Sequence, residues 1–223
     1  MGITERRERE KTMRRSTILG CTRELILARG VENVRMEDIA EKSELSKATL
    51  YLHFPSKEAI FGDICDESAR DFFEYLKTIP ASGHSGMQAI RFLWQGYVKL
   101  FGSSNEMLIA FRIRSYLDSW PADDRRKVES PHIGAIFAAL HAMVEQCKAD
   151  GIFDSGLDSA KAVQMMLLLF SDIIRDASSL PLGERNSPAI VGEMTKTFQI
   201  LIRGFASEGT EHSLLDITIP EGS

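Results

Sequence analysis

The chain has 223 residues, of which 43% are hydrophobic, so it can form one large domain or a small domain with a larger one. This composition is ordinary for a globular protein and argues against wholesale disorder. The longest apolar run, residues 165–170, is far too short to span a bilayer. The charged N-terminus lacks the apolar segment of a signal peptide, and the three cysteines are widely spaced. We therefore expect a cytoplasmic, reduced protein without a disulfide framework.

The charge is distributed unevenly along the chain. The net charge is −5, which by itself argues against a nucleic-acid partner. Residues 1–57, however, hold 12 Lys and Arg against 9 Asp and Glu, while the remainder holds 15 against 23. A basic N-terminal segment on an acidic body is typical of a small module that binds a polyanion and is attached to a body that does not.

The first predicted helix follows a dense run of mixed charge from Arg6 to Arg15. This run is either a solvated, frayed start of the helix or a basic arm that contacts phosphate or a minor groove. From Thr17 the apolar residues recur every three or four positions, which predicts one apolar helix face ending at Gly30. The positions on this face are Ile18, Leu19, Cys21, Leu25, Ile26 and Ala28.

Two short helices are predicted next, at residues 36–42 and 47–53. Acidic residues occupy the first turn of the earlier one, where the helix dipole favours them. Ser46 can cap the later one through its hydroxyl. About two turns are not stable alone, so packing of Leu50 and Phe54 on neighbouring helices must hold this helix in place.

The polar side chains of the helix at residues 47–53 suggest a reading surface. We assign Lys47, Thr49, Tyr51 and His53 to its outer face, and each has a hydrogen-bonding tip. A short helix held rigidly by two others and carrying such side chains is what recognition in the DNA major groove requires.

Lys57 stands where the next helix begins, after Pro55 and a capping Ser56. Its ammonium and the unpaired backbone N–H groups of that first turn could hold a phosphate together. Taken alone, Lys57 could equally be an ordinary exposed lysine.

The segment IAEKSELSKATLYLHFPSKEAIF resembles the DNA-binding signature of the TetR family of transcriptional repressors. The resemblance covers roughly the first 60 residues. It implies an all-α protein with an N-terminal three-helix helix-turn-helix domain and a larger C-terminal helical domain that dimerises and binds a small effector. It also implies which positions contact DNA: Ser46, Lys47, Thr49, Tyr51, His53 and Lys57.

Two residues depart from the family pattern. Glu44 replaces the usual glycine of the turn, and we expect it to fit if its φ stays negative. Arg35 replaces a threonine that caps the second helix, which costs about 1 kcal/mol of capping but adds a cation that can reach a phosphate. We therefore include Arg35 among the predicted DNA-binding residues.

Apolar periodicity predicts helices through the rest of the chain. The helix at 57–79 is long enough to connect two domains, and Pro131 either kinks or splits the helix at 123–150. The predicted domains are a DNA-binding domain at 1–56, an effector-binding and dimerisation domain at 57–207 and a flexible tail at 208–223. The predicted helices of the body are 57–79, 87–101, 105–117, 123–150, 159–178 and 188–206.

The last two predicted helices suggest a dimer interface. The helix at 159–178 is apolar on nearly every side, so it can pack on its own core and on a second subunit. Two such helices from each subunit would form a four-helix interface, as the resemblance also implies. The other interpretation is a well-buried monomer core. The predicted interface residues are Met166, Leu169, Phe170, Ile173, Met194, Phe198 and Leu201.

Aromatic and methionine side chains of the body are candidates for an apolar effector site. Each of them could instead belong to the core. Arg112 lies in an apolar stretch and needs a partner, either an internal carboxylate, which we favour, or an anionic effector. The candidate effector residues are Trp94, Tyr97, Met107, Phe111, Arg112, Trp120, Phe137, His141 and Met165.

The sequence contains no enzyme motif: no phosphate-binding glycine loop, no nucleophile elbow and no metal-ligand cluster. We therefore predict no cofactor and no catalysis. The predicted function is a homodimeric repressor, released from a palindromic DNA operator by a small, largely apolar or aromatic effector. The alternative is a helical small-molecule-binding protein, or an activator, that retains the three-helix module.

Overall fold

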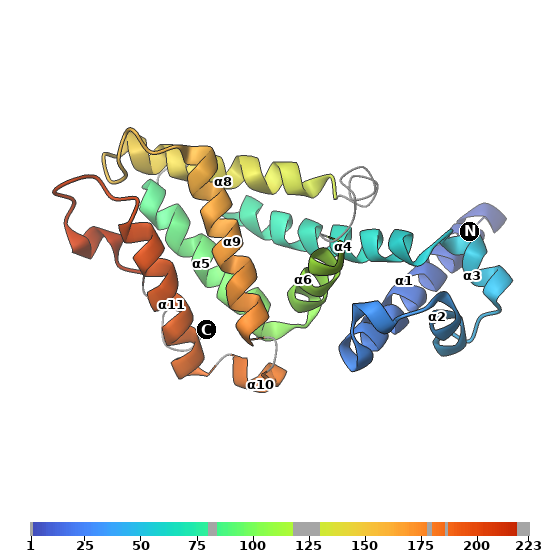
Figure 1. The fold of residues 1–223 in the computed structure, drawn as a ribbon. Helices are drawn as coiled ribbons and strands as arrows, with labels where there is room; N and C mark the ends of the chain where they lie inside the picture. The colour runs from blue at the N-terminus through green and yellow to red at the C-terminus, as the bar shows by residue number, and fades with distance from the viewer. Residues whose placement is uncertain (1, 80–83, 118–129, 178–179, 186, 218–223) are drawn as a thin grey trace. The chain divides into compact units, whose positions relative to one another are not determined.

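The computed structural model describes residues 2–79, 84–117, 130–177, 180–185 and 187–217 (Figure 1). These residues form an all-α fold, as predicted. Phe153 and Ala206 add an isolated antiparallel β-bridge. The α-helices are α1 (Ile3–Arg29), α2 (Met36–Lys42), α3 (Lys47–His53), α4 (Lys57–Thr78), α5 (Gly86–Ser103), α6 (Glu106–Leu117), α8 (His132–Ala149), α9 (Ser159–Ala177), α10 (Leu182–Arg185) and α11 (Pro188–Arg203); the 3₁₀-helices are η1 (Val31–Asn33) and η2 (His212–Leu215).

The chain divides into two compact units. Unit 1 comprises residues 1–68 and 109–130, and unit 2 comprises residues 69–108 and 131–223. The first turns of α4 therefore belong to unit 1 and its last turns to unit 2, whereas α6 begins in unit 2 and continues in unit 1 from Ile109. Unit 1 is larger than the DNA-binding domain expected at 1–56, because α4 and α6 contribute side chains to its core.

The core of unit 1 joins the three N-terminal helices to parts of α4 and α6. Leu50 and Phe54, which were expected to hold α3, are 0% and 1% exposed. Ile60 and Phe61 of α4 pack in the same cluster. The short α3 is thus stabilised by tertiary burial, as its length requires. The other members of the cluster are Ile18, Leu19, Leu25, Ile26, Val31, Val34, Met36, Ile39, Ala40, Ile64, Ile109, Ile113 and Leu117.

Helix α1 is longer than its apolar pattern. It begins at Ile3, so the charged run at residues 6–15 is helical and mostly exposed, and Arg6 pairs with Glu10 one turn on. Gly30 ends α1 at φ 82°, with its N–H donating to Ile26 O at 3.0 Å. The predicted stop is therefore confirmed, and the start of the helix was hidden because its first turns bury no apolar face.

The turn between α2 and α3 corrects one expectation. Glu44 has φ 56°, and among the described residues it is the one non-glycine residue at positive φ. We expected a negative φ there. In this turn Leu45 N–H donates to Ala40 O at 2.9 Å, and Glu44 adopts the left-handed conformation despite its side chain. That strain costs about 1–2 kcal/mol for an L-residue with a side chain.

Unit 2 is built around stacked aromatic side chains. The Trp94 ring lies 4.5 Å from Phe198, and the Tyr97 ring lies 4.3 Å from Phe170, between ring centroids. Their polar atoms are satisfied inside the protein: Trp94 Nε1 donates to Thr195 Oγ1 at 3.0 Å, and the Tyr97 hydroxyl donates to Phe170 O at 2.6 Å. Burial raises the pKa of Tyr97 well above its usual value, so this hydroxyl stays protonated.

Helix α5 approaches its neighbours closely at two glycines. A Cβ on Gly96 would lie 1.9 Å from the Tyr75 ring, and one on Gly86 would lie 2.4 Å from the backbone nitrogen of Cys147. Gly86 N–H also donates to Asp150 Oδ2 at 2.7 Å. These contacts fix α5 against α4 and α8 within unit 2.

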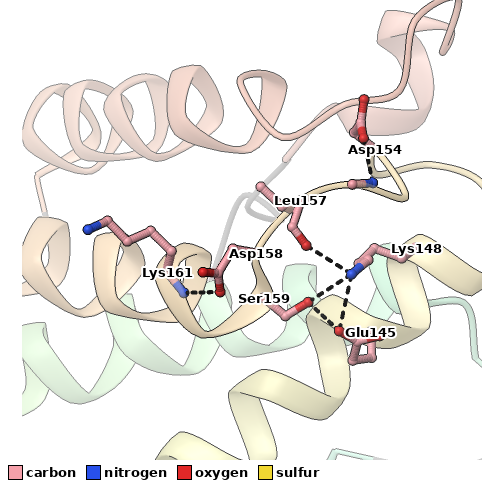
Figure 2. A network of polar contacts seen from close by, with 8 residues as sticks. Glu145, Lys148, Asp154, Leu157, Asp158, Ser159 and Lys161 are labelled. Atoms are coloured by element: carbon pink, nitrogen blue, oxygen red, sulfur yellow. Dashed lines mark hydrogen bonds and ion pairs between the residues drawn. The ribbon is translucent and has the colours of Figure 1, made fainter.

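A polar network holds the turn between α8 and α9 (Figure 2). Lys148 Nζ donates to Leu157 O at 2.9 Å and to Ser159 Oγ at 3.3 Å, and it pairs with Glu145. The Ser159 hydroxyl donates to the same carboxylate and lowers the pKa of Glu145, with a further contribution from Lys148. Asp158 caps α9 by accepting from Lys161 N–H at 3.0 Å. The start of α9 is therefore firmly placed on the end of α8.

The C-terminal stretch at 208–217, where a flexible tail was expected, contains two buried side chains. Leu215 and Ile217 are 1% and 4% exposed. Arg91 donates to the carbonyl oxygens of Leu214 at 2.7 Å and Asp216 at 2.8 Å. The expectation rested on the polar composition of this stretch and overlooked these two apolar residues. Residues 218–223 lie outside the described part.

The remaining element predictions agree with the structure within a few residues. Pro131 immediately precedes α8, so the predicted helix at 123–150 begins at His132, while residues 118–129 lie outside the described ranges. Helix α10 and the 3₁₀-helices were not predicted, because they are too short to show periodicity. Of the described helices, none combines the length and apolar composition needed to cross a membrane.

The three cysteines are free thiols. Burial raises the pKa of Cys65 and of Cys147 to about 12, so both remain protonated at neutral pH. Among the residues that the structure describes, no cluster of His, Cys, Asp and Glu could hold a metal ion.

Candidate nucleic-acid interface

Helix α3 is built by a side-chain cap and a single buried leucine. Ser46 Oγ accepts from Thr49 N–H at 3.1 Å, as the sequence predicted. It also bonds Thr49 Oγ1 at 2.8 Å, so both hydroxyls serve the helix start. Leu50 points into the core and fixes which side of α3 faces outward.

The centre of the outer face differs from the predicted one. Successive residues are about 100° apart around a helix, so the positions opposite Leu50 are Ala48 and Leu52. Ala48 is exposed, and Leu52 is 86% exposed. Thr49 and Tyr51 flank this centre, and Tyr51 is 49% exposed. Alternate residues lie about 200° apart around a helix, so the four predicted residues do not share one face. Lys47 is exposed at the edge of the outer face, and His53 is half-buried.

His53 is turned partly inward. Its Nδ1 is buried, and within the described structure it has no hydrogen-bond partner. Its carbonyl oxygen accepts from Arg15 Nη1 at 2.8 Å. The predicted DNA contact of His53 therefore depends on its other ring edge.

Arg15 was treated as part of a charge run, yet it holds the end of α3. Besides its bond to His53 O, its guanidinium pairs with Asp63 of α4 and lies 4.0 Å from the centre of the Phe54 ring. A planar guanidinium can make these contacts together, which an ammonium cannot. No sequence signal separates Arg15 from its charged neighbours.

A second ion pair joins α1 to α4 in unit 1. Arg23 Nη2 lies 2.6 Å from Glu67 Oε2, and the two side chains are 16% and 35% exposed. Asp63 and Glu67 are four residues apart, so they share one face of α4. The start of α4 is thus fixed to α1 at two successive turns.

Lys57 is directed into unit 1. Its Nζ donates to Val34 O at 3.3 Å and lies 5.1 Å from the centre of the Tyr116 ring. Ser56 Oγ accepts from Ala59 N–H at 3.3 Å, which confirms the predicted cap. The phosphate contact of Lys57 stays a prediction, and the structure adds an internal acceptor.

Arg35 and Lys47 are exposed cations of the helix-turn-helix. Lys47 Nζ lies 2.9 Å from Glu37 Oε1, and its hydrogen bond and charge lower the pKa of that carboxylate. Arg35 precedes α2 without a side-chain cap, and its backbone N–H donates to Asp38 Oδ2 at 3.0 Å. Both cations remain at the surface of the helix-turn-helix.

The predicted effector residues fall into different environments. Trp94 and Tyr97 are fully buried in the aromatic core of unit 2. Phe137 stacks on His141 along α8 at 6.4 Å, and Met165 is 43% exposed. Of the others, Met107 is half-buried in unit 2, Phe111 and Arg112 are half-buried in unit 1, and Trp120 lies outside the described residues.

The predicted dimer residues lie mostly inside the chain. Met166 and Phe198 are 0% exposed, and Phe170 and Met194 are also buried. These four side chains have little or no surface left for a second copy, and their part in a dimer stays a prediction. Ile173 is buried as well, while Leu169 and Leu201 are half-buried. The outward apolar residues of α9 and α11 are Met165, Leu168 and Ile200, at 43%, 62% and 71% exposed.

Three features thus coincide in unit 1. The helices α2 and α3 are joined by a tight turn, α3 is held in place by contacts with α1 and α4, and the outer face of α3 is exposed. This arrangement defines a helix-turn-helix DNA-binding protein.

Comparison with known proteins supports this class. Residues 18–64 match the family model described as bacterial regulatory proteins, tetR family. The comparison with curated proteins found no match. Residues 18–64 are therefore similar to the DNA-binding domain of the tetR family, whose members are transcriptional regulators.

Solved structures share the whole fold at low sequence identity. The TetR family regulator PfmR from Thermus thermophilus matches with a TM-score of 0.65 at 20% identity, over 83% of this chain and 97% of that one. The fatty acid degradation regulator FadR from Bacillus halodurans matches at 0.66 and 16% identity, over 84% and 94%. A gamma-butyrolactone receptor (ArpA-like protein) matches at 0.62 and 18% identity, over 92% and 95%.

Proposed function

We propose that this protein is a ligand-released transcriptional repressor that binds a palindromic operator as a homodimer in the cytoplasm. The observation that carries the proposal is the exposed outer face of α3, held rigidly by Leu50, Phe54 and Arg15. In a symmetric dimer, two copies of α3 would enter successive major grooves about 34–36 Å apart.

A homodimer is supported by apolar side chains that remain exposed on unit 2. Met165 and Leu168 of α9, together with Ile200 of α11, are too large and too exposed to be explained by the core of one chain. Exposed apolar side chains gathered on two helices are typical of a subunit interface. These three residues replace the buried ones in the proposed interface.

A small, largely apolar effector is supported by the similar proteins and by unit 2. A gamma-butyrolactone receptor and a regulator of fatty acid degradation share the fold. In this chain the indole of Trp94 and the hydroxyl of Tyr97 already have internal partners, so we place effector contacts first at half-buried Phe137 and His141. Met107, Phe111, Arg112, Trp120 and Met165 remain proposed contacts.

Operator binding is tested with full-length protein and duplexes from its own upstream region. We expect Tyr51→Ala to weaken specific binding by about tenfold or more, since base contacts contribute roughly 1–3 kcal/mol each. Binding to random duplex should change little. Equal loss on both duplexes would show that Tyr51 does not read sequence.

Release by ligand is tested by a thermal-shift screen of apolar and aromatic compounds, followed by operator binding with each hit. A repressor's effector should raise the melting temperature and weaken operator binding, because the two ligands oppose each other through one coupling free energy. A hit that tightens operator binding, or reporter output that falls on gene deletion, would indicate an activator instead.

A further inference from the structure

Leu52 is the most exposed of the large hydrophobic side chains in the described structure. It is 86% exposed, against 71% for Ile200 and 62% for Leu168. Single exposed leucines are common on protein surfaces and usually need no explanation. Leu52, however, stands on the one helix whose outer face is expected to enter a DNA groove.

The position of Leu52 on α3 is central rather than marginal. Leu50 is 0% exposed and marks the inner side, and Leu52 lies about 200° further around the helix. Ala48 lies one turn earlier on the same line and is exposed as well. The middle of the outer face is therefore an apolar stripe, and the polar Thr49 and Tyr51 stand on either side of it.

The chemistry of this stripe selects one feature of the major groove. The edges of G, C and A present hydrogen-bonding groups there, whereas thymine alone adds the C5-methyl group. Leu52 and Ala48 carry no donor or acceptor, so they cannot satisfy a base edge by hydrogen bonding. Burying an isobutyl group against a methyl group is favourable for both, because both leave water.

We propose that Ala48 and Leu52 recognise thymine methyl groups, so that Leu52 determines a preference for A·T pairs at the centre of each half-site. This inference rests on the proposed operator binding and extends it to a specificity-determining residue. Tyr51 and Thr49 then read or position the neighbouring base pairs. The surface is continuous with the helix-turn-helix, which favours DNA over a protein partner as its occupant.

The test begins with duplexes selected from a random library by the full-length wild-type protein and by Leu52→Ala. Because the side chain makes almost no internal contact, Leu52→Ala should keep the wild-type melting temperature. We expect one or two positions of each half-site to change from a strong preference for T to no preference. Leu214→Ala, which removes a 48% exposed leucine from η2, is the matched control and should select the wild-type sequence.

Replacing dT by dU at those positions then removes only the methyl group. The wild type should lose about fourfold in affinity for each contacted methyl group, while Leu52→Ala should bind the dT and dU duplexes equally. Leu52→Asn, which keeps the size and branching of the side chain but not its apolar character, should also lose the distinction.

Three results would overturn the inference. The wild type could bind dU duplexes as tightly as dT duplexes, the Leu52 variants could keep the wild-type methyl dependence, or they could alter self-association without altering DNA binding. If the wild type selects no duplex at all, it is the operator-binding proposal that fails, so the two failures are distinguishable.

Discussion

Helix α3 of unit 1 and the aromatic core of unit 2 use large side chains in opposite ways. On α3, Tyr51 and Leu52 are 49% and 86% exposed, so both side chains are open to a partner. In unit 2, Trp94 and Tyr97 are 0% and 1% exposed, and their polar atoms are satisfied within the chain. The large side chains of α3 are therefore candidates for binding a partner, whereas the buried aromatic side chains of unit 2 mainly stabilise the fold.

The largest expected effect tests whether Trp94 is core. Trp94→Ala removes a fully buried ring that stacks on Phe198 and Tyr97, and should lower the free energy of unfolding by about 3–5 kcal/mol. Denaturant unfolding measures it. Trp94→Phe keeps an aromatic ring and should lose much less, mainly the bond to Thr195. Unchanged stability with a lost ligand response would instead make Trp94 a wall of the effector site.

The next effect concerns Arg15, which positions α3 without facing DNA. Arg15→Ala removes the bond to His53 O and leaves Asp63 unpaired, so it should cost about 2 kcal/mol of stability. Operator affinity should fall while the slope of log K against log salt stays unchanged, because no phosphate contact is lost.

Arg6→Ala is the control for Arg15. Arg6 makes an exposed i,i+4 pair with Glu10, and its loss should change stability by less than about 0.5 kcal/mol. A reduced salt slope in Arg15→Ala would show that Arg15 contacts phosphate and is part of a basic arm.

Lys47 and Lys57 give a matched pair of smaller effects. Lys47 lies at the surface beside Glu37, whereas Lys57 donates inward to Val34 O. We expect Lys47→Ala to reduce the salt slope by about one without loss of stability. Lys57→Ala should instead lower the free energy of unfolding by about 1–2 kcal/mol. A reduced salt slope for Lys57→Ala, with no such change for Lys47→Ala, would show that Lys57 contacts phosphate.

The smallest expected effect is a gain in stability at the turn between α2 and α3. Glu44→Gly should stabilise the protein by about 1 kcal/mol, because glycine adopts φ 56° without the steric cost that glutamate pays. Thermal unfolding measures it. Glu41→Gly, in α2 where φ is helical, should destabilise by about the same amount. If both changes destabilise, the side chain of Glu44 makes a contact that outweighs the strain.

The sequence by itself determined the elements and most of the DNA-binding unit. Ser46 as a cap and Gly30 as a helix stop are local signals, since each acts within one or two turns of its own position. The apolar pattern also marked Leu50 and Phe54 as core. Local rules of capping and periodicity can be read without knowing the fold. The TetR resemblance added the family, and the comparisons matched residues 18–64 to the model of the same family.

Only the tertiary structure decided which way side chains point and what they meet. In the structure Lys57 donates to Val34 O, and Arg15 donates to His53 O. Trp94 and Phe198 stack in one core. Leu215 and Ile217, in the stretch at 208–217, are buried as well. These contacts join residues that are far apart in the sequence. The charge or hydrophobicity of a residue does not determine which distant residue it will contact.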